Sequence, residues 1–412
     1  RAAALAQLED RVAAARGGAG QLVVVRGAVG LGKSRLLAEL GGLLDERGFV
    51  TARGEGQPFG TPTSYAAWHP VWRQLLRVPA RLSPADQAAR ATRRVRKLEP
   101  SVLQRVPLLG AALGVPIADN ELTARLDPKL RKASLESLLV TLLERLTDAG
   151  RPLAILLDDA QWLDPLSVDL LGAITRSVID RPVLLVLAQR SETGDDALAD
   201  LAELPRLSLV DLAELDAESS RTIAATTFAR LGYSDRDVSD ALLDALLDRA
   251  EGNPYYLEEL INFLHLRGVD LTDPSVLRSA ELPDSLQGLT LSRVDTLPES
   301  PRITLKVASV VGRRFGTAML HGTYPEVGSP VELDAQLTDL VRAGLIVRET
   351  AETRPGDDAH AFRHVITAQA AYEAIPVTLR ERLHENAGDY LLRHEREGST
   401  IGLDRLAYHY GR

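Results

Sequence analysis

The chain has 412 residues, which is too long for one compact unit at about 100 to 200 residues per domain, so we expect two to four domains. Hydrophobic residues make up 45% and charged residues 25% of the sequence, a balance that excludes global disorder, and the net charge of −9 disfavours nucleic acid as a partner. The sequence has no cysteine, which excludes disulfides and thiolate metal sites, and no apolar run of about 18 residues, so we expect a cytoplasmic protein that does not span a membrane.

The first half of the chain alternates short apolar runs with helical patterns. Five runs have the length of strands, and they lie at 21–26, 49–53, 153–157, 183–188 and 207–210. Helical patterns lie at 2–15, 34–44, 133–146 and 166–178. This alternation is typical of a parallel sheet that is covered by helices. Residues 1–210 are therefore expected to form an α/β core.

The second half shows no strand pattern for over a hundred residues after about Asp211. Three consecutive helices are expected first, and together they would form a helical lid over 211–281; they lie at 217–231, 239–249 and 256–266. Asp216 and Ser239 are the N-caps that we expect for the first two of these helices, because their side-chain oxygens can accept hydrogen bonds from the free N–H groups of a first turn.

A proline-marked boundary at Leu282 and Pro283 opens a third region, 282–376. It contains helical patterns and then two strands with a polar loop between them; the helices lie at 287–295, 301–310 and 331–343, and the strands at 344–348 and 361–364. Helices followed by a two-stranded ribbon are the outline of a winged-helix domain. From 377 to 412 the pattern is helical again.

A phosphate-binding motif follows the first expected strand. Residues 27–34 read G-x4-G-K-[ST] between a strand and the start of a helix, as the P-loop of an ATPase does. The glycines let backbone N–H groups converge on phosphates, Lys33, solvated in the empty site, would meet the β and γ phosphates, and the Ser34 hydroxyl would reach Mg²⁺. The residues expected to bind ATP or ADP here are Gly27, Gly30, Leu31, Gly32, Lys33, Ser34 and Arg35. A glycine turn that binds nothing is the alternative.

Two adjacent carboxylates end the strand expected at 153–157, as on the Mg²⁺ side of a P-loop ATPase. Asp158 would hold Mg²⁺ together with Ser34, and Asp159 would orient or deprotonate the attacking water. For Asp159 the alternative is a helix N-cap. The neighbouring Gln161, Trp162 and Asp164 are interpreted as packing and capping groups.

Arg190 follows the fourth strand, which in this architecture lies beside the γ phosphate of the nucleotide. An arginine there can distinguish ATP from ADP, and we group it with Lys33 and Asp159 as a catalytic candidate; a surface salt bridge is the alternative. The densest basic cluster is interpreted as a solvated helix face, and it comprises Arg90, Arg93, Arg94, Arg96 and Lys97.

Four segments together carry a family resemblance, and they are 27–37, 156–165, 252–260 and 362–364. They resemble the AAA-like STAND ATPases of bacterial signalling proteins, which include cyclase-linked ATPase and TPR proteins and large LuxR-type regulators. The resemblance implies that Pro254 lies against the bound nucleotide, so that the winged helix senses its state, although 252–254 taken alone is a turn. It also implies that 377–412 is the start of a TPR-like helical region. The first residue, Arg1 rather than Met, suggests a piece of a longer chain.

The expected function is a signalling switch that binds ATP or ADP with Mg²⁺, hydrolyses ATP slowly and reports the nucleotide state to an output domain of the parent chain, a nucleotide cyclase or a transcriptional regulator. Its expected partners are the nucleotide, those other domains and a nucleotide-dependent homo-oligomer. One alternative is a DNA-binding regulator, which the 15 basic and 18 acidic residues of 283–412 disfavour. Another is a scaffold that holds nucleotide without hydrolysing it.

Overall fold

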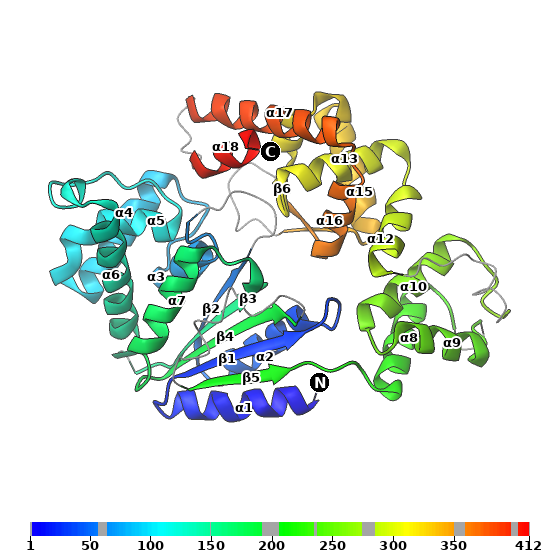
Figure 1. Cartoon of the computed structure of the whole chain (residues 1–412), viewed down its shortest axis with the longest axis horizontal. Coiled ribbons are helices and arrows are strands. Elements are labelled where there is room, and N and C mark those ends of the chain that lie inside the picture. The colour runs from blue at the N-terminus through cyan, green and yellow to red at the C-terminus, as the bar shows by residue number, and fades with distance from the viewer. Residues whose placement is uncertain are drawn as a thin grey trace.

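The structure of the protein is a computed structural model, and it describes residues 2–56, 64–148, 150–191, 206–234, 237–273, 285–349, 359–396 and 403–411. Figure 1 shows a sheet with a helical insertion on one side, a smaller helical unit on the other, and the C-terminal part of the chain above the carboxyl ends of the strands. The boundary that we expected at Leu282 and Pro283 lies outside the described residues. No helix in the described ranges is both long and apolar enough to cross a lipid bilayer.

Five parallel strands form the sheet, in the order β2-β3-β4-β1-β5. Their bounds are β1 Gln21–Gly27, β2 Val50–Glu55, β3 Leu153–Asp158, β4 Val183–Arg190 and β5 Leu207–Asp211. This confirms the α/β core with a parallel sheet that the alternating pattern predicted.

Both faces of the sheet are buried, which explains why its strands read as continuous apolar runs. In β1, Leu22 and Val24 pack on one face and Val23 and Val25 on the other, because successive side chains of a strand point in opposite directions. Two helices cover the second of these faces, α1 (Ala2–Arg16) and α2 (Lys33–Glu46). The first face is covered by α7 (Pro165–Ser177) and by helices inserted between β2 and β3.

The insertion is a layer of helices. The sequence pattern predicted only the last of them, at 133–146. The layer comprises α3 Trp68–Leu76, α4 Pro84–Leu98, α5 Leu109–Leu113 and α6 Pro128–Asp148, with short 3₁₀ turns between them. Trp68 and Trp72 are fully buried there, and the Trp68 Nε1 donates to the Ser167 carbonyl over 3.2 Å. Burial of two large aromatic side chains fixes this layer against the sheet.

Three helices follow the sheet, and they have their own hydrophobic core; they are α8 Ala217–Arg230, α9 Asp240–Ala250 and α10 Pro254–Leu266. Asp216 and Ser239 cap α8 and α9 as expected, since their side chains accept hydrogen bonds from the N–H groups of Ser219 and Leu242. We call these three helices the lid.

The C-terminal part contains helices around a small antiparallel sheet of order β6-β8-β7. Its elements are α12 Leu286–Asp295, α13 Glu299–Val311, β6 Arg314–Gly316, α14 Thr317–Thr323, α15 Pro330–Arg342, β7 Ile346–Arg348, β8 Ala359–Phe362, α16 Val365–Glu373, α17 Val377–Arg396 and α18 Leu403–Tyr410. Leu383 and Leu406, from the last two helices, belong to the same hydrophobic core as α13 to α16.

Two expectations for this part were wrong. β6 is a strand in a stretch where none was expected, so the sheet has three strands rather than two. Only one of its three residues, Phe315, is apolar, and the strand exists because it pairs with β8. The strand expected at 361–364 ends at Phe362, and His364 instead precedes α16 as its N-cap residue.

A buried ion pair joins the lid to the C-terminal part. The Arg293 Nη1 on α12 donates to both carboxylate oxygens of Glu259 on α10, over 2.5 and 2.7 Å, and the Arg293 Nη2 donates to the Ala343 carbonyl. Both charged side chains are at least nine-tenths buried. Neither charge can be left alone in this environment without a large desolvation cost, so the pair fixes the relative placement of the two units.

Candidate nucleotide site

The strand order brings the expected site residues together. β1 and β3 flank β4 on its two sides, and all three strands run in the same direction. Their carboxyl ends therefore meet at one edge of the sheet, and these ends carry the P-loop, Asp158 and Arg190. Crevices at the carboxyl ends of parallel strands are where α/β proteins bind ligands.

The P-loop has the backbone geometry of a phosphate cradle. Gly30 and Gly32 have φ angles of 87° and 88°, a left-handed conformation that favours glycine, and Gly32 is the N-cap residue of α2. A Cβ atom on Gly30 would lie 2.5 Å from the Oδ1 of Asn253, so this position also admits no side chain for steric reasons. The cradle and the helix N-terminus behind it together fit a bound anion.

Lys33 is buried rather than solvated, which contradicts our expectation. Only 8% of the residue is exposed, and its Nζ donates to the carbonyls of Gly27 and Ala28 over 2.7 and 2.9 Å. The ammonium group is close enough to the loop's own carbonyl oxygens to satisfy its donors there. Phosphate oxygens at this place would therefore replace backbone acceptors rather than water.

Ser34 and Asp158 contact each other, as a shared metal site requires. The Ser34 hydroxyl is hydrogen-bonded to the Asp158 carboxylate, whose Oδ1 also accepts from the Asp159 N–H over 2.9 Å. Burial raises the pKa of Asp158 above its ordinary value, while the hydrogen bond from Ser34 opposes that shift. A hydroxyl and a buried carboxylate on adjacent elements are oxygen donors that fit Mg²⁺.

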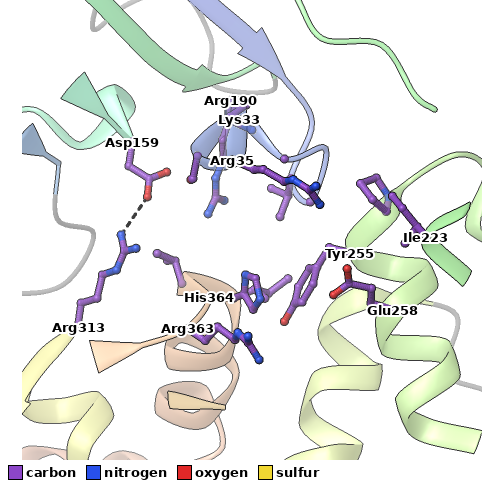
Figure 2. Close-up of a pocket in the computed structure, with 17 residues that line it drawn as sticks. Lys33, Arg35, Asp159, Arg190, Ile223, Tyr255, Glu258, Arg313, Arg363 and His364 are labelled. Carbon is purple, nitrogen blue, oxygen red and sulfur yellow. Dashed lines mark hydrogen bonds and ion pairs between the residues drawn. The ribbon is translucent and has the colours of Figure 1, made fainter. Parts of the chain in front are cut away.

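Asp159 lies in the cavity and does not act as a helix cap. Its side chain accepts no capping hydrogen bond from the short 3₁₀ helix that follows, and its φ of 51° turns it away from the strand. Its Oδ1 accepts from the Gln161 Nε2 over 2.9 Å, and its Oδ2 lies 3.3 Å from the Nη1 of Arg313 (Figure 2). Burial, with the neighbouring Asp158 charge, raises the pKa of Asp159 to about 6.

Arg190 also reaches the cavity. Its guanidinium carbon lies 4.7 Å from the centroid of the Trp162 ring, a cation–π arrangement, and its backbone N–H donates to the Gln161 Oε1 over 3.2 Å. Gln161 thus connects the ends of β3 and β4, and Trp162 supports Arg190. Asp164 caps α7 by accepting from the Ser167 N–H over 3.0 Å, in agreement with the capping role expected of it.

The cavity has a volume of about 270 Å³ and is lined by residues from three parts of the chain. Of the expected site residues, the following line it: Gly30, Gly32, Lys33, Ser34, Arg35, Asp159, Arg190 and Pro254. Three expected site residues do not line it: Gly27, Leu31 and Asp158. Leu31 is buried, and a Cβ on Gly27 would lie 3.1 Å from that of Leu212. Five of the described lining side chains are lysine or arginine and two are acidic, an excess of positive charge that suits a polyphosphate.

The sequence comparisons identify the first part of the chain. Residues 1–186 match the family model described as the AAA ATPase domain. We refer to the part of the chain that matches this model as the AAA domain. Over 419 residues the chain is also 26% identical to an uncharacterized protein of Rhizobium meliloti (strain 1021), an alignment that covers 98% of this chain and 38% of that protein.

One solved structure resembles this chain in fold, and others give weaker matches. One match is a Signal Transduction ATPase with Numerous Domains (STAND) protein from Pyrococcus horikoshii, which has a tetratricopeptide repeat sensor. Its TM-score is 0.53 and its identity 13%, over 98% of this chain and 48% of that one. The ORC1 protein of Aeropyrum pernix, solved in complex with DNA, matches with a TM-score of 0.37 and 16% identity, over 91% and 92% of the two chains. The fold of this chain therefore resembles that of the STAND protein, and the chain spans less than half of the STAND protein and of the bacterial relative.

The structure adds cavity residues that motif reasoning did not single out. Tyr255 follows Pro254 on α10, and its ring packs at 4.2 Å between centroids against His364. Burial and the nearby arginines lower the pKa of His364 to about 4, so the imidazole is neutral. Arg313 and Arg363 come from the C-terminal part and line the cavity, and Arg313 points across it toward Asp159 (Figure 2).

Arg313 makes an ion pair with Glu55 at the end of β2 and a second one with Asp159. Burial lowers the pKa of Arg313 to about 10, which leaves its guanidinium charged at neutral pH. A cation from the C-terminal part therefore neutralises the carboxylate that is closest to the expected site of hydrolysis. The short strand β6, which the sequence did not reveal, positions this arginine.

Asn253 ties the lid to the P-loop. Its Oδ1 accepts from the Tyr256 N–H over 3.1 Å, which caps α10, and its Nδ2 donates to the Val29 carbonyl over 2.8 Å. Asn253→Ala should lower the free energy of unfolding by about 1 to 2 kcal/mol, because a cap and a second hydrogen bond are lost. It should also speed the release of a fluorescent ADP analogue severalfold, which stopped-flow fluorescence measures.

Ser239→Ala is the matched control, because Ser239 caps α9 in the same lid without contacting the P-loop. It should lower stability by about 1 kcal/mol and leave the release rate unchanged. Equal release rates in the two variants would show that the contact with Val29 has no influence on nucleotide binding.

Proposed function

We propose that the chain is a nucleotide-operated switch that binds ATP or ADP with Mg²⁺, hydrolyses ATP slowly, and communicates the nucleotide state to the rest of its parent protein. One observation carries this proposal: a single cavity is lined by the P-loop, by the lid and by the C-terminal part. A change from ATP to ADP in that cavity changes the contacts of all three units at once. Such a differential contact is what a ligand needs in order to shift a conformational equilibrium.

The residues of the AAA domain have separate tasks in this proposal. Lys33 exchanges its backbone acceptors for the β and γ phosphate oxygens, and the N–H groups of the P-loop donate to the same phosphates. Ser34 and Asp158 would hold Mg²⁺, which neutralises charge on the transferred phosphoryl group when it is bound. Arg190, supported by Trp162, would contact the γ phosphate and distinguish ATP from ADP.

Asp159 would orient the attacking water and accept its proton, and its pKa of about 6 suits a base at neutral pH. Arg313 restrains the Asp159 carboxylate through the ion pair between them. The hydrolytic rate would then depend on the position of the C-terminal part. A slow ATPase whose rate follows domain position is suited to signalling rather than to work on a substrate.

The remaining assignments extend this proposal. We assign 1–210 to the ATPase core, 211–281 to the lid, 282–376 to a winged-helix domain and 377–412 to the start of a TPR-like region. The output domain, a cyclase or a transcriptional regulator, lies outside this chain in the proposal, and a nucleotide-dependent homo-oligomer would form in the ATP state. DNA is not proposed as a ligand of the winged helix, because 283–412 carries a net charge of −3.

The pH dependence of phosphate release tests the role of Asp159. The carboxylate is the active form of a base, so kcat/KM should rise as the pH passes upward through about 6. About one-tenth of Asp159 is ionised at pH 5 and about nine-tenths at pH 7, so the rise should be about tenfold. This rise of about tenfold is read from the ratio of the wild-type kcat/KM to the kcat/KM of Asp159→Asn. The ratio is used because the titration of ATP itself affects both proteins.

A ratio that stays constant between pH 5 and pH 7 would contradict a base at this position. A protein that binds nucleotide tightly, yet releases no phosphate in a steady-state assay, would instead favour the scaffold.

A further inference from the structure

A second cavity, of about 610 Å³, lies between the inserted helices and the C-terminal part of the chain. Its wall is formed by the end of β2, by α3 and the turn that follows it, by α4 and by β6. The volume lies within the range of about 300 to 1,000 Å³ that is usual for small-molecule sites. None of the residues assigned above to nucleotide binding or hydrolysis lines this cavity.

Positive charge is concentrated on this wall, although the whole chain has a net charge of −9. Five arginines line it, and they are Arg73, Arg77, Arg81, Arg90 and Arg314. Glu55 is the acidic residue among the described lining residues, and its charge is already paired with Arg313. Burial lowers the pKa of His69, on the same wall, to about 4, so this imidazole adds no opposing or supporting charge.

The arginines differ in how firmly they are held. Arg73 donates from Nη2 to the Gly114 carbonyl over 3.2 Å, and Arg314 donates from Nε to the Glu349 carboxylate over 2.9 Å. The Arg77 backbone adopts a φ of 55°, an uncommon left-handed conformation, and its carbonyl accepts a hydrogen bond from the Arg90 Nε. Among the described residues, no carboxylate pairs with the guanidinium of Arg77, Arg81 or Arg90, so these three can bind an anion.

The chemistry of the wall defines the class of ligand. Guanidinium groups bind phosphates through paired N–H donors, and several of them around one cavity fit an anion with more than one phosphate. Val78, Pro79 and Ala80 add an apolar segment that a carbon skeleton can contact. We propose that this arginine cavity is a binding site for a small organic molecule with two or more phosphate groups.

The cavity is connected to the site of hydrolysis through Glu55. This carboxylate pairs with Arg313, which in turn contacts Asp159, and the Arg314 Nη2 lies 3.9 Å from the Glu55 Oε2. A phosphate that binds Arg314 draws that arginine away from Glu55, which strengthens the pairing of Glu55 with Arg313 and weakens the restraint on Asp159. The ligand is therefore an effector that raises the rate of hydrolysis. This linkage rests on the proposed function, whereas the binding site itself does not.

Isothermal titration of the 412-residue chain tests the binding site. With the P-loop filled by saturating ADP and Mg²⁺, fructose 1,6-bisphosphate and inorganic tripolyphosphate are titrated separately, and at least one should bind with a stoichiometry of one. Tighter binding of the bisphosphate would support an organic ligand. Tighter binding of tripolyphosphate would indicate an inorganic ligand and would overturn the organic part of the proposal. Arg81→Ala and Arg90→Ala should each weaken binding roughly 10-fold, the usual effect of losing one charged hydrogen bond.

Arg96→Ala is the control, because Arg96 is exposed on the same helix α4 and does not line the cavity. It should leave the affinity unchanged. No binding at millimolar probe, or the same loss in Arg96→Ala as in Arg81→Ala, would overturn the site, since the second result shows attraction by surface charge alone.

The linkage has a separate readout. At saturating ATP, where competition at the P-loop is negligible, the probe that binds should raise kcat severalfold, and Arg81→Ala should shift this rise to a roughly 10-fold higher probe concentration. Binding without any change in kcat would overturn the linkage, whereas the proposal of a binding site would stand. Failure of the nucleotide assignments would appear instead as absent ATP turnover with the arginine-dependent binding intact.

Discussion

Lys33→Ala should weaken ATP binding about 10²-fold or more while the chain remains folded. The Nζ of Lys33 is buried beside the carbonyls of Gly27 and Ala28, where the phosphates of a bound nucleotide would replace those acceptors. Removing one partner of a buried, hydrogen-bonded charge pair usually costs 2 to 5 kcal/mol of binding free energy. Titration of a fluorescent ATP analogue measures the loss.

The structure changes what this substitution should do to stability. Because Lys33 donates to two carbonyls of the P-loop, we expect a loss of about 1 kcal/mol in the free energy of unfolding rather than none. Lys97→Ala is the matched control, since Lys97 is exposed at the end of α4 and lines neither cavity. Wild-type affinity in Lys33→Ala, or an equal loss in Lys97→Ala, would show that the P-loop is not the nucleotide site.

Asp159→Asn should slow ATP hydrolysis about 10²-fold or more and leave nucleotide affinity near that of the wild type. A positioned base contributes about 10² to 10⁴ to a rate, and the amide cannot accept the proton. The substitution keeps the shape of the side chain and removes the charge that Arg313 neutralises. Single-turnover hydrolysis, measured beside the affinity, gives both quantities, and the variant should accumulate in the ATP-bound form.

Asp158→Asn is the contrasting variant, because Asp158 is adjacent in sequence and contacts Ser34 instead. It should weaken nucleotide binding only when Mg²⁺ is present, since a neutral amide stabilises the cation less than a carboxylate does. If Asp159→Asn hydrolyses ATP at the wild-type rate, the base assignment is wrong. If both variants lose Mg²⁺-dependent affinity equally, the two carboxylates do not have separate roles.

The sequence determined the core of the protein and the location of its nucleotide motif. Burial on both faces leaves each strand as an apolar run, and the carboxyl ends of parallel strands share one edge, so β1 and β3 could be expected to bring Lys33 and Asp158 together. The N-caps of α8 and α9 were equally predictable, because a cap acts within one helical turn. All of these features depend on local pattern or on a general rule of parallel sheets.

Only the tertiary structure decided which groups close the site. Arg313 reaches Asp159 across 154 positions, and Asn253 reaches Val29 across 224. β6, which positions Arg313, has no apolar pattern of its own and forms by pairing with β8. The burial of Lys33 and the grouping of Arg81, Arg90 and Arg314 around one cavity likewise depend on how distant elements pack. Local periodicity reports which face of an element is buried, whereas the partner that buries it is chosen by the packing of the whole chain.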